Sequence, residues 1–217
     1  MYSKRIEALA DFVDEKCNLA DVGSDHGYLL ILLRERLFSG LLLGIENKKG
    51  PFLSLSKNIS NCKYSKSIKL SFSDGLDEIT NEYDTVVMAG MGFDNINKII
   101  QKNTLKLDSI KAFIIDAHTK IPDLRMFFDK LGYYISREII IFEDGIFYEI
   151  IKFEKGHKEY LKSDYEFGPI LRINKGDLFI KKYENQIINY EKMLSNITNE
   201  SIKKEIKEKI DEIKETL

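Results

Sequence analysis

Two acidic residues and two glycines stand close together in the segment Asn18-Leu-Ala-Asp-Val-Gly-Ser-Asp-His-Gly-Tyr28. The apolar residues predict a short buried strand, Gly23 permits a tight turn after it, and Gly27 allows the next helix to pack closely. A dinucleotide fingerprint has the spacing G-x-G-x-x-G and binds a pyrophosphate. Asp21 and Asp25 would repel a pyrophosphate but suit a ligand with an ammonium and a sulfonium group, such as S-adenosylmethionine. Taken alone, the motif fits a glycine turn in another α/β protein equally well.

Two further acidic residues follow the next apolar runs. Leu41-Leu-Leu-Gly-Ile-Glu46 predicts a second strand, and Glu46 stands 23 residues after Gly23. A carboxylate about 20 residues after the first glycine is expected to bind ribose hydroxyls, although Glu46 could also be a solvated acid at a strand end. A third strand over 68–72 leads into Ser73-Asp74-Gly75-Leu76, where the acid and the glycine could hydrogen-bond an adenine amine.

The rest of this region alternates strands with helices. Apolar runs at 83–88 and 112–116 predict two more strands, and the glycine-rich exit Ala89-Gly90-Met91-Gly92 follows the first of them. Helical spacing predicts helices between the strands, over 28–38, 52–59, 94–101 and 122–131. Such alternation indicates βαβ units in a parallel sheet, with ligands at the carboxyl ends of the strands.

The sheet is expected to end in an antiparallel hairpin. Two β-rich runs, 134–143 and 146–153, are joined by Asp144-Gly145, a hairpin turn signal. Five parallel strands followed by such a hairpin are typical of Rossmann-like, class I S-adenosylmethionine-dependent methyltransferases rather than of dehydrogenases. The predicted fold class is therefore α/β of this Rossmann-like kind.

The pattern changes after the polar stretch 154–159, which predicts a methyltransferase domain at 1–156 and a helical domain at 157–217. A heptad seam runs through Ile180, Tyr183, Ile187, Tyr190, Leu194 and Ile197, breaks near 196–200, and resumes at Ile206, Ile210, Ile213 and Leu217. We expect an antiparallel helical hairpin in which each helix buries its seam against the other. Structural support, a grip on RNA and dimerisation all fit such a hairpin, and the expected state is a monomer or weak dimer.

The order of four motifs resembles the bacterial TrmK family, the tRNA (adenine-22-N1)-methyltransferases. The motifs are Ala-Asp-Val-Gly-Ser-Asp-His-Gly-Tyr at 20–28, Gly-Ile-Glu-Asn-Lys-Lys-Gly-Pro at 44–51, Ser-Asp-Gly-Leu at 73–76 and Met-Ala-Gly-Met-Gly at 88–92. Further matches are Leu124-Arg125, 131–133, Glu138, 143–150 and 167–171, so the resemblance covers nearly the whole chain. It implies S-adenosylmethionine as the methyl donor and an adenosine in the D-arm region of tRNA as the substrate.

Three positions depart from the family's usual pattern. Phe93 stands where a glycine is usual, and Asp116-Ala117-His118 replaces a common Gln-Pro segment. Gly27 replaces an alanine, which is a mild change. The first two departures bear on the substrate pocket more than on the cofactor site.

Methylation of adenine N1 requires alignment rather than a base, because the N1 lone pair is free. The product is a cation, which a nearby carboxylate would stabilise as its charge develops. Asp25 is the preferred carboxylate, with a helix N-cap as its alternative role. Tyr28 could stack on an extruded adenine or be a buried helix aromatic. Gly90 and Met91 would receive the target base, so the expected catalytic residues are Asp25, Tyr28, Gly90 and Met91.

The expected cofactor-binding residues follow the ends of the first four strands. They are Asp21, Gly23, Ser24, His26, Glu46, Asn47, Asp74, Gly75, Ala89 and Gly90. For His26 a role as a helix-start residue is favoured over a contact with the target base. No metal site is expected, because His118 and His157 lack partners at ligand spacing, and the isolated Cys17 and Cys62 signal neither zinc nor a disulfide.

Composition limits the possible partners. With 43% hydrophobic and 31% charged residues in 217, the chain can bury one sizeable core and an appendage. A net charge of −2 gives no global sign of nucleic-acid binding. Contacts to tRNA would therefore come from local basic pairs, such as Lys4-Arg5, Lys48-Lys49 and Lys181-Lys182. Each pair could also be ordinary solvated surface.

The apolar runs are too short to span a membrane. The charged N-terminus, with Ile6, Leu9, Ala10 and Val13 at helical spacing, predicts a packed helix rather than a signal peptide. We therefore expect a cytoplasmic protein.

Other functions remain open from the residues alone. A methyltransferase for a small molecule would use the same cofactor site but would need a lid, and a methyltransferase for another RNA base would need no change of fold. An RNA-binding module without activity would have no use for Asp21, Asp25, Glu46 and Asp74.

Overall fold

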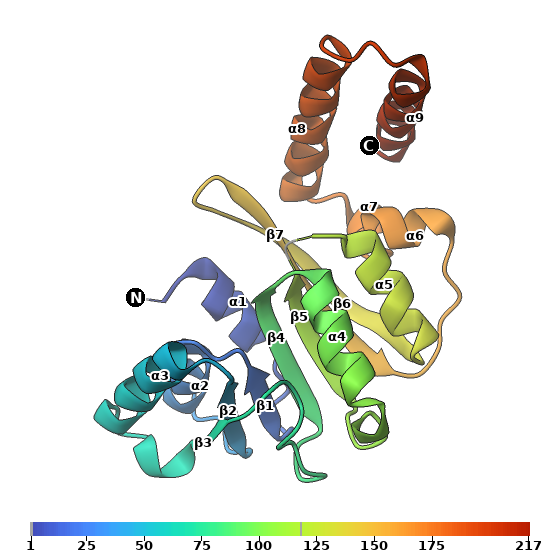
Figure 1. Cartoon of the computed structure of the whole chain (residues 1–217). Helices are drawn as coiled ribbons and strands as arrows, with labels where there is room; N and C mark the ends of the chain where they lie inside the picture. The colour runs from blue at the N-terminus through green and yellow to red at the C-terminus, as the bar shows by residue number, and fades with distance from the viewer. Residues whose placement is uncertain (1, 118) are drawn as a thin grey trace.

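The computed structural model describes residues 2–117 and 119–217, so His118 lies outside the described residues. Within them, seven strands form one sheet in the order β3-β2-β1-β4-β5-β7-β6 (Figure 1). The strands are β1 (Leu19–Val22), β2 (Leu42–Glu46), β3 (Lys69–Phe72), β4 (Thr85–Met91), β5 (Ala112–Ala117), β6 (Tyr133–Glu143) and β7 (Ile146–Lys155). The first five run parallel, and β7 pairs antiparallel with both β5 and β6. The predicted fold class is confirmed.

Helices cover both faces of the sheet. They are α1 (Lys4–Asp11), α2 (Tyr28–Glu35), α3 (Lys49–Asn61), α4 (Phe93–Lys102) and α5 (Ile121–Lys130), with short 3-10 turns at Ser65–Ser67 and Thr104–Lys106. One buried cluster joins the sheet to α1, α2 and α3, and another joins it to α4 and α5 (Figure 1). The predicted N-terminal helix is present as α1, and Ser3 caps it by accepting a hydrogen bond from the Ile6 amide at 3.3 Å.

The glycine-rich segment after the fourth predicted strand is not a loop. β4 continues through Gly90 to Met91, and its pairing with β5 shifts register between Ala89 and Met91. Gly90 has φ 72°, a left-handed conformation that glycine adopts without strain. The segment is therefore a β-bulge at the end of a strand, a device that re-aims backbone groups beside a site.

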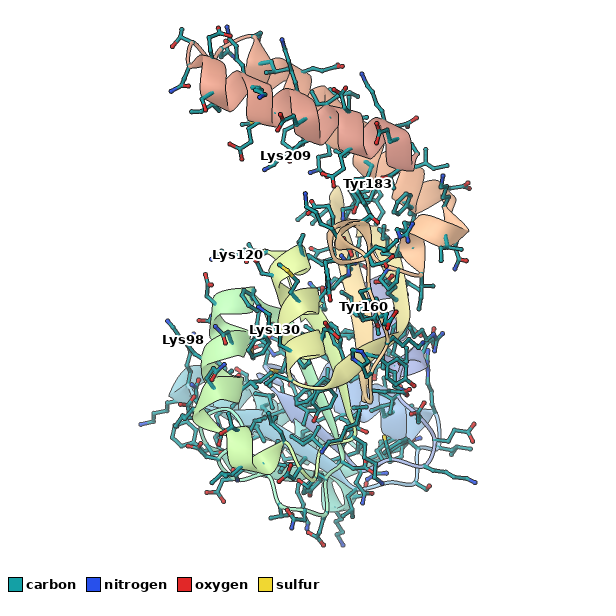
Figure 2. All side chains as sticks on the ribbon, turned by 90° about the vertical axis from the view of Figure 1, so that its right-hand side faces the viewer. Lys98, Lys120, Lys130, Tyr160, Tyr183 and Lys209 are labelled. Carbon is teal, nitrogen blue, oxygen red and sulfur yellow. The ribbon has the colours of Figure 1, made fainter. Side chains whose placement is uncertain are left out.

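The C-terminal part contains the predicted antiparallel hairpin, made of α8 (Asp177–Leu194) and α9 (Glu200–Thr216), which projects away from the sheet (Figures 1 and 2). Two short helices precede it, α6 (Lys162–Phe167) and α7 (Leu171–Asn174). The two seams pack on each other as expected, and at the base of the hairpin they also pack on the rest of the chain. There Phe179, Tyr183 and Ile213 pack with Phe167 and with Ile140 of β6.

A buried ion network fastens these helices to the sheet. Arg125 of α5 pairs with Glu138 and Glu149, and its Nη1 donates to the Tyr165 carbonyl at 3.0 Å. Lys182 of α8 also pairs with Glu149. Burial alone would raise the pKa of Glu149, but Lys182 and Arg125 outweigh it and hold that pKa below its ordinary value. Charged side chains from four elements, α5, β6, β7 and α8, therefore depend on one another.

We predict that Arg125→Ala lowers the free energy of unfolding by about 3–5 kcal/mol, because it leaves buried carboxylates without their partner. Urea unfolding followed by circular dichroism measures this. Arg36→Ala is the control, since Arg36 pairs with Glu7 and Asp11 at the surface and should cost no more than about 1 kcal/mol. Equal losses in the two variants would contradict the prediction.

Candidate active site

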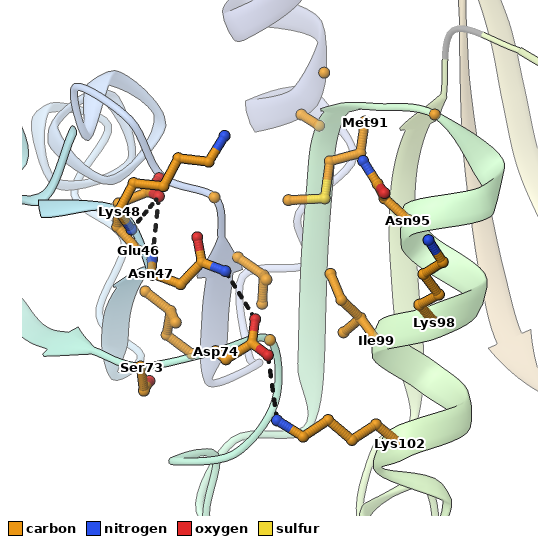
Figure 3. A pocket seen from close by; sticks show the side chains of 17 residues that line it. Glu46, Asn47, Lys48, Ser73, Asp74, Met91, Asn95, Lys98, Ile99 and Lys102 are labelled. Atoms are coloured by element: carbon orange, nitrogen blue, oxygen red, sulfur yellow. Dashed lines mark hydrogen bonds and ion pairs between the residues drawn. The ribbon is translucent and has the colours of Figure 1, made fainter. Parts of the chain in front are cut away.

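A cavity of about 620 Å³ opens at the carboxyl ends of β1, β2 and β4 and is closed on one side by α4 (Figure 3). β1 pairs with β2 on one side and with β4 on the other. The order in which successive strands are added to the sheet therefore reverses between β1 and β4. Ligands of open α/β sheets bind at such a switch point. The lining residues are Val22, Gly23, Ile45, Glu46, Asn47, Lys48, Ser73, Asp74, Gly75, Ala89, Gly90, Met91, Gly92, Asn95, Lys98, Ile99 and Lys102.

Glu46 is held in a fixed orientation at the end of β2. Its Oε1 accepts hydrogen bonds from the backbone amides of Asn47 and Lys48, both at 3.1 Å. The side chain is largely buried yet lines the cavity (Figure 3). A carboxylate fixed in this way is suited to accept hydrogen bonds from two neighbouring hydroxyl groups of a ribose.

Asp74 is held in the turn after β3, between Asn47 and Lys102 (Figure 3). Its Oδ1 accepts from Asn47 Nδ2 at 2.8 Å and its Oδ2 from Lys102 Nζ at 3.2 Å (Figure 3). These two partners lower the pKa of Asp74. Gly75 has φ 56°, and a Cβ there would stand 2.7 Å from Ile99. The turn therefore needs glycine to bring Asp74 close to α4.

Asp21 does not line the cavity, although it precedes two residues that do. It is buried at the end of β1, and burial, together with the nearby Glu46, raises its pKa to about 7. Ser24 donates its hydroxyl to the Asp21 backbone carbonyl at 2.7 Å and closes the turn. A cation in the adjacent cavity would favour the ionised form of Asp21.

Asp25 and His26 lie in the turn before α2 and Tyr28 is the first residue of that helix; none of the three lines the cavity. Asp25 is exposed, has φ 47°, and places its Oδ2 3.6 Å from His26 Nε2. The N-cap of α2 is Gly27 and has no side-chain capping bond, so the capping role for Asp25 is excluded. Tyr28 is 48% exposed and stacks on His26 with ring centres 5.4 Å apart; it is not a buried aromatic.

Gly23 and Met91 approach each other closely across β1 and β4. Gly23 has φ 77°, and a Cβ on it would lie 2.4 Å from Met91 Cε. The Met91 side chain therefore lies against the first turn and forms a wall of the cavity (Figure 3). Its flexible thioether gives an adaptable apolar surface.

The sequence reasoning missed the wall that α4 provides. Asn95, Lys98, Ile99 and Lys102 fall three and four residues apart, so they share the helix face that meets the cavity. That periodicity could have identified them. Phe93, the first residue of α4, stands where a glycine was expected from the family resemblance. It does not line the cavity, and its ring centre lies 5.7 Å from that of Phe127.

Among residues 2–117 and 119–217, no group of three or more His, Cys, Asp or Glu side chains is placed to hold a metal ion. No helix within the same ranges is long and apolar enough to cross a membrane.

Comparison with known proteins decides the family. The profile of TrmK, described as tRNA (adenine(22)-N(1))-methyltransferase, matches residues 19–216. The chain belongs to the TrmK family. The tRNA (adenine(22)-N(1))-methyltransferase of Bacillus subtilis is 28% identical over 219 residues, covering 97% of this chain and 92% of the relative.

Solved structures related to the TrmK family agree over the full length. Mycoplasma capricolum TrmK with S-adenosyl-homocysteine superposes with a TM-score of 0.88 at 28% identity, covering 99% of this chain and 97% of that one. A Streptococcus pneumoniae protein in complex with S-adenosyl-L-methionine gives a TM-score of 0.92 at 32% identity and covers both chains completely. The predicted resemblance and cofactor are confirmed.

We predict that Glu46→Ala weakens S-adenosylmethionine binding by about 1.5–3 kcal/mol, because charge-assisted hydrogen bonds to the ribose are lost. Isothermal titration calorimetry measures the Kd, with circular dichroism to verify the fold. Asp77→Ala is the control. Asp77 is a carboxylate close to the site that pairs with Lys102 at 2.9 Å, as Asp74 does, but it does not line the cavity. An unchanged Kd for the Glu46 variant would remove it from the binding site.

Proposed function

We propose that this chain transfers a methyl group from S-adenosylmethionine to N1 of adenine 22 in tRNA. The observation that carries this proposal is the cavity at the switch point, with Glu46 and Asp74 fixed on its walls beside the Gly90 bulge, in a chain that the TrmK profile matches over 19–216. A tRNA substrate also favours a cytoplasmic location, and we propose a monomer or weak dimer.

The residues present fit the cofactor. Glu46 would accept hydrogen bonds from the ribose hydroxyls and Asp74 from the adenine amine, while Asn47 and Gly75 border the same space. Gly23, Ala89 and Gly90 leave room for the rest of the ligand, because small residues allow close approach of the backbone. Asp21, Ser24 and His26 would act from the turn around it. The bound cofactor supplies a methyl group on a positively charged sulfur.

The transfer needs alignment of the adenine with that methyl group. The N1 lone pair forms the new N–C bond as the C–S bond breaks, and the purine gains the positive charge. We propose that the Asp25 carboxylate stabilises this charge and that Tyr28, fixed against His26, stacks on the extruded base. The Gly90 bulge and the Met91 side chain would form the floor on which the base rests.

Binding of a folded tRNA requires a larger surface than the cavity. Extrusion of a base costs a few kcal/mol, which contacts to the tRNA body must supply. The hairpin α8–α9 projects toward the side of the molecule that carries Lys98, Lys120 and Lys130, and Lys209 lies on the hairpin itself (Figure 2). All four lysines are exposed, and we propose that they contact phosphates there.

Incubation of the protein with labelled S-adenosylmethionine and total tRNA, followed by mapping of the modified nucleoside, tests the function. We expect 1-methyladenosine at position 22 and no label in a transcript that carries guanosine there. Label at another base or position would overturn the proposal.

We predict that Asp25→Asn lowers the single-turnover rate constant by roughly two to three powers of ten, the value of a lost transition-state interaction of about 3–4 kcal/mol. The KM for tRNA and thermal stability should change little, because Asn tolerates the left-handed backbone as Asp does. Asp144→Asn is the control, since Asp144 has φ 50° in the β6–β7 turn. If the rate constant of the Asp25→Asn variant stays within a few-fold of the parent's, Asp25 does not stabilise the transition state, and catalysis depends on alignment of the substrates alone.

We predict that shortening the hairpin weakens tRNA binding without affecting the cofactor. Residues 188–205 are replaced by a short glycine turn and Lys209 by alanine, which keeps the base of the hairpin with Phe179, Tyr183 and Ile213 in place. The Kd for tRNA, measured by filter binding, should rise about tenfold or more because phosphate contacts are lost, while the Kd for S-adenosylmethionine stays constant. Parental tRNA affinity would show that the hairpin does not grip the substrate.

A further inference from the structure

Arg5 of α1 is held by two partners, Asp116 on β5 and Tyr148 on β7. Its Nε and Nη2 donate to Asp116 Oδ2 at 3.0 and 2.7 Å. Its guanidinium carbon lies 4.3 Å from the ring centre of Tyr148. The Asp116 side chain is fully buried, whereas the Arg5 side chain keeps 25% of its surface exposed. A planar cation is thus fixed in position with part of its surface open to solvent.

The strand register places this group next to the cavity. Asp116 stands opposite Ala89 of β4, a lining residue, and opposite Ile150 of β7. Neighbouring strands are about 4.8 Å apart, and Tyr148 shares the sheet face of Ile150 because side chains alternate along a strand. The Arg5 guanidinium therefore lies on the α1 side of the Gly90 bulge.

The same end of α1 also reaches the aromatic pair at the start of α2. The Tyr2 ring meets the Tyr28 ring edge-on, with centres 6.3 Å apart, and its hydroxyl donates to Glu35 at 3.0 Å. Tyr2 and Arg5 are one helical turn apart in the chain. Tyr2 thus connects the N-terminal side of α1, where Arg5 lies, with the start of α2, where Tyr28 lies.

We propose that Arg5 is a base-binding residue: the extruded adenine stacks on its guanidinium plane, on the side of the base away from Tyr28. This inference rests on the proposed function. Guanidinium planes stack on unpaired bases in RNA recognition, and a side chain already held by a carboxylate and an aromatic ring loses little freedom when it does so.

The charge of Asp116 suits this role. A lone guanidinium would repel the cationic purine that the reaction produces. Paired with Asp116, Arg5 presents a planar stacking surface with little net charge.

Arg5→Ala and Arg5→Lys test the proposal. We measure the single-turnover rate of adenine 22 methylation at saturating tRNA, the Kd for tRNA and the Kd for S-adenosylmethionine. Lysine keeps the ion pair with Asp116 but has no planar group, so both variants should lose about tenfold or more in the single-turnover rate, as for removal of one stacking contact. The Kd for S-adenosylmethionine should stay within about twofold, as expected for a residue that does not line the cavity.

Arg137→Ala is the matched control. Arg137 also ties α1 to the sheet, since its Nη1 donates to the Asp11 carbonyl at 2.7 Å and its guanidinium lies 4.3 Å from the Phe12 ring centre. Arg137 acts at the other end of α1, so the single-turnover rate of the Arg137→Ala variant should stay near that of the parent. If Arg5→Lys retains the parental rate, or if Arg5→Ala loses no more than Arg137→Ala, Arg5 only anchors the helix and the proposal fails.

Two further outcomes are separable. If Arg5→Ala does not fold, the Arg5→Lys rate alone decides for or against stacking. A parent protein that does not methylate adenine 22 would overturn the proposed function, whereas a parent that does so and an Arg5→Lys variant of equal rate would overturn only the role of Arg5.

Discussion

The arrangement of the site depends on the parallel pairing of β1 with two strands at once. Val22 stands level with Ile45 of β2 and with Met88 of β4. The residues that follow, Gly23, Glu46 and Ala89, therefore stand at the same height along the sheet and around one space. A shift of one residue in either ladder would turn the side chains to the opposite face. The polar groups need no long loops to meet, because the register of three buried strands brings them together.

The sequence predicts the groups that lie directly at strand ends, because strand alternation and glycine turns are local signals. Glu46, Asp74 and the Gly23 turn are of this kind, and all three line the cavity. The continuation of β4 through Gly90 was not predictable in the same way, since a glycine pair usually marks a loop and the bulge depends on pairing with β5. The helices α6 and α7 are too short to show a periodicity. Arg5 and Asp116 are 111 residues apart, and nothing local in either segment indicates their contact.

The buried ion network and the apolar cluster at the base of the hairpin have complementary parts in holding the C-terminal helices. The cluster of Phe167, Phe179 and Tyr183 supplies non-directional burial. Arg125 and Lys182 reach a common partner, Glu149, and that requirement is directional. Replacement of buried ion pairs by apolar residues is often neutral for stability, so what the charges add to the cluster is a directional requirement on the contact between α8 and β7.

The close approach of Gly23 and Met91 links two positions that are far apart in the chain. A side chain at 23 would meet Met91 Cε and would also have to adopt a left-handed backbone. In evolutionary terms position 23 is constrained mainly by its backbone, because the flexible end of Met91 can move aside whereas the left-handed conformation penalises any side chain there.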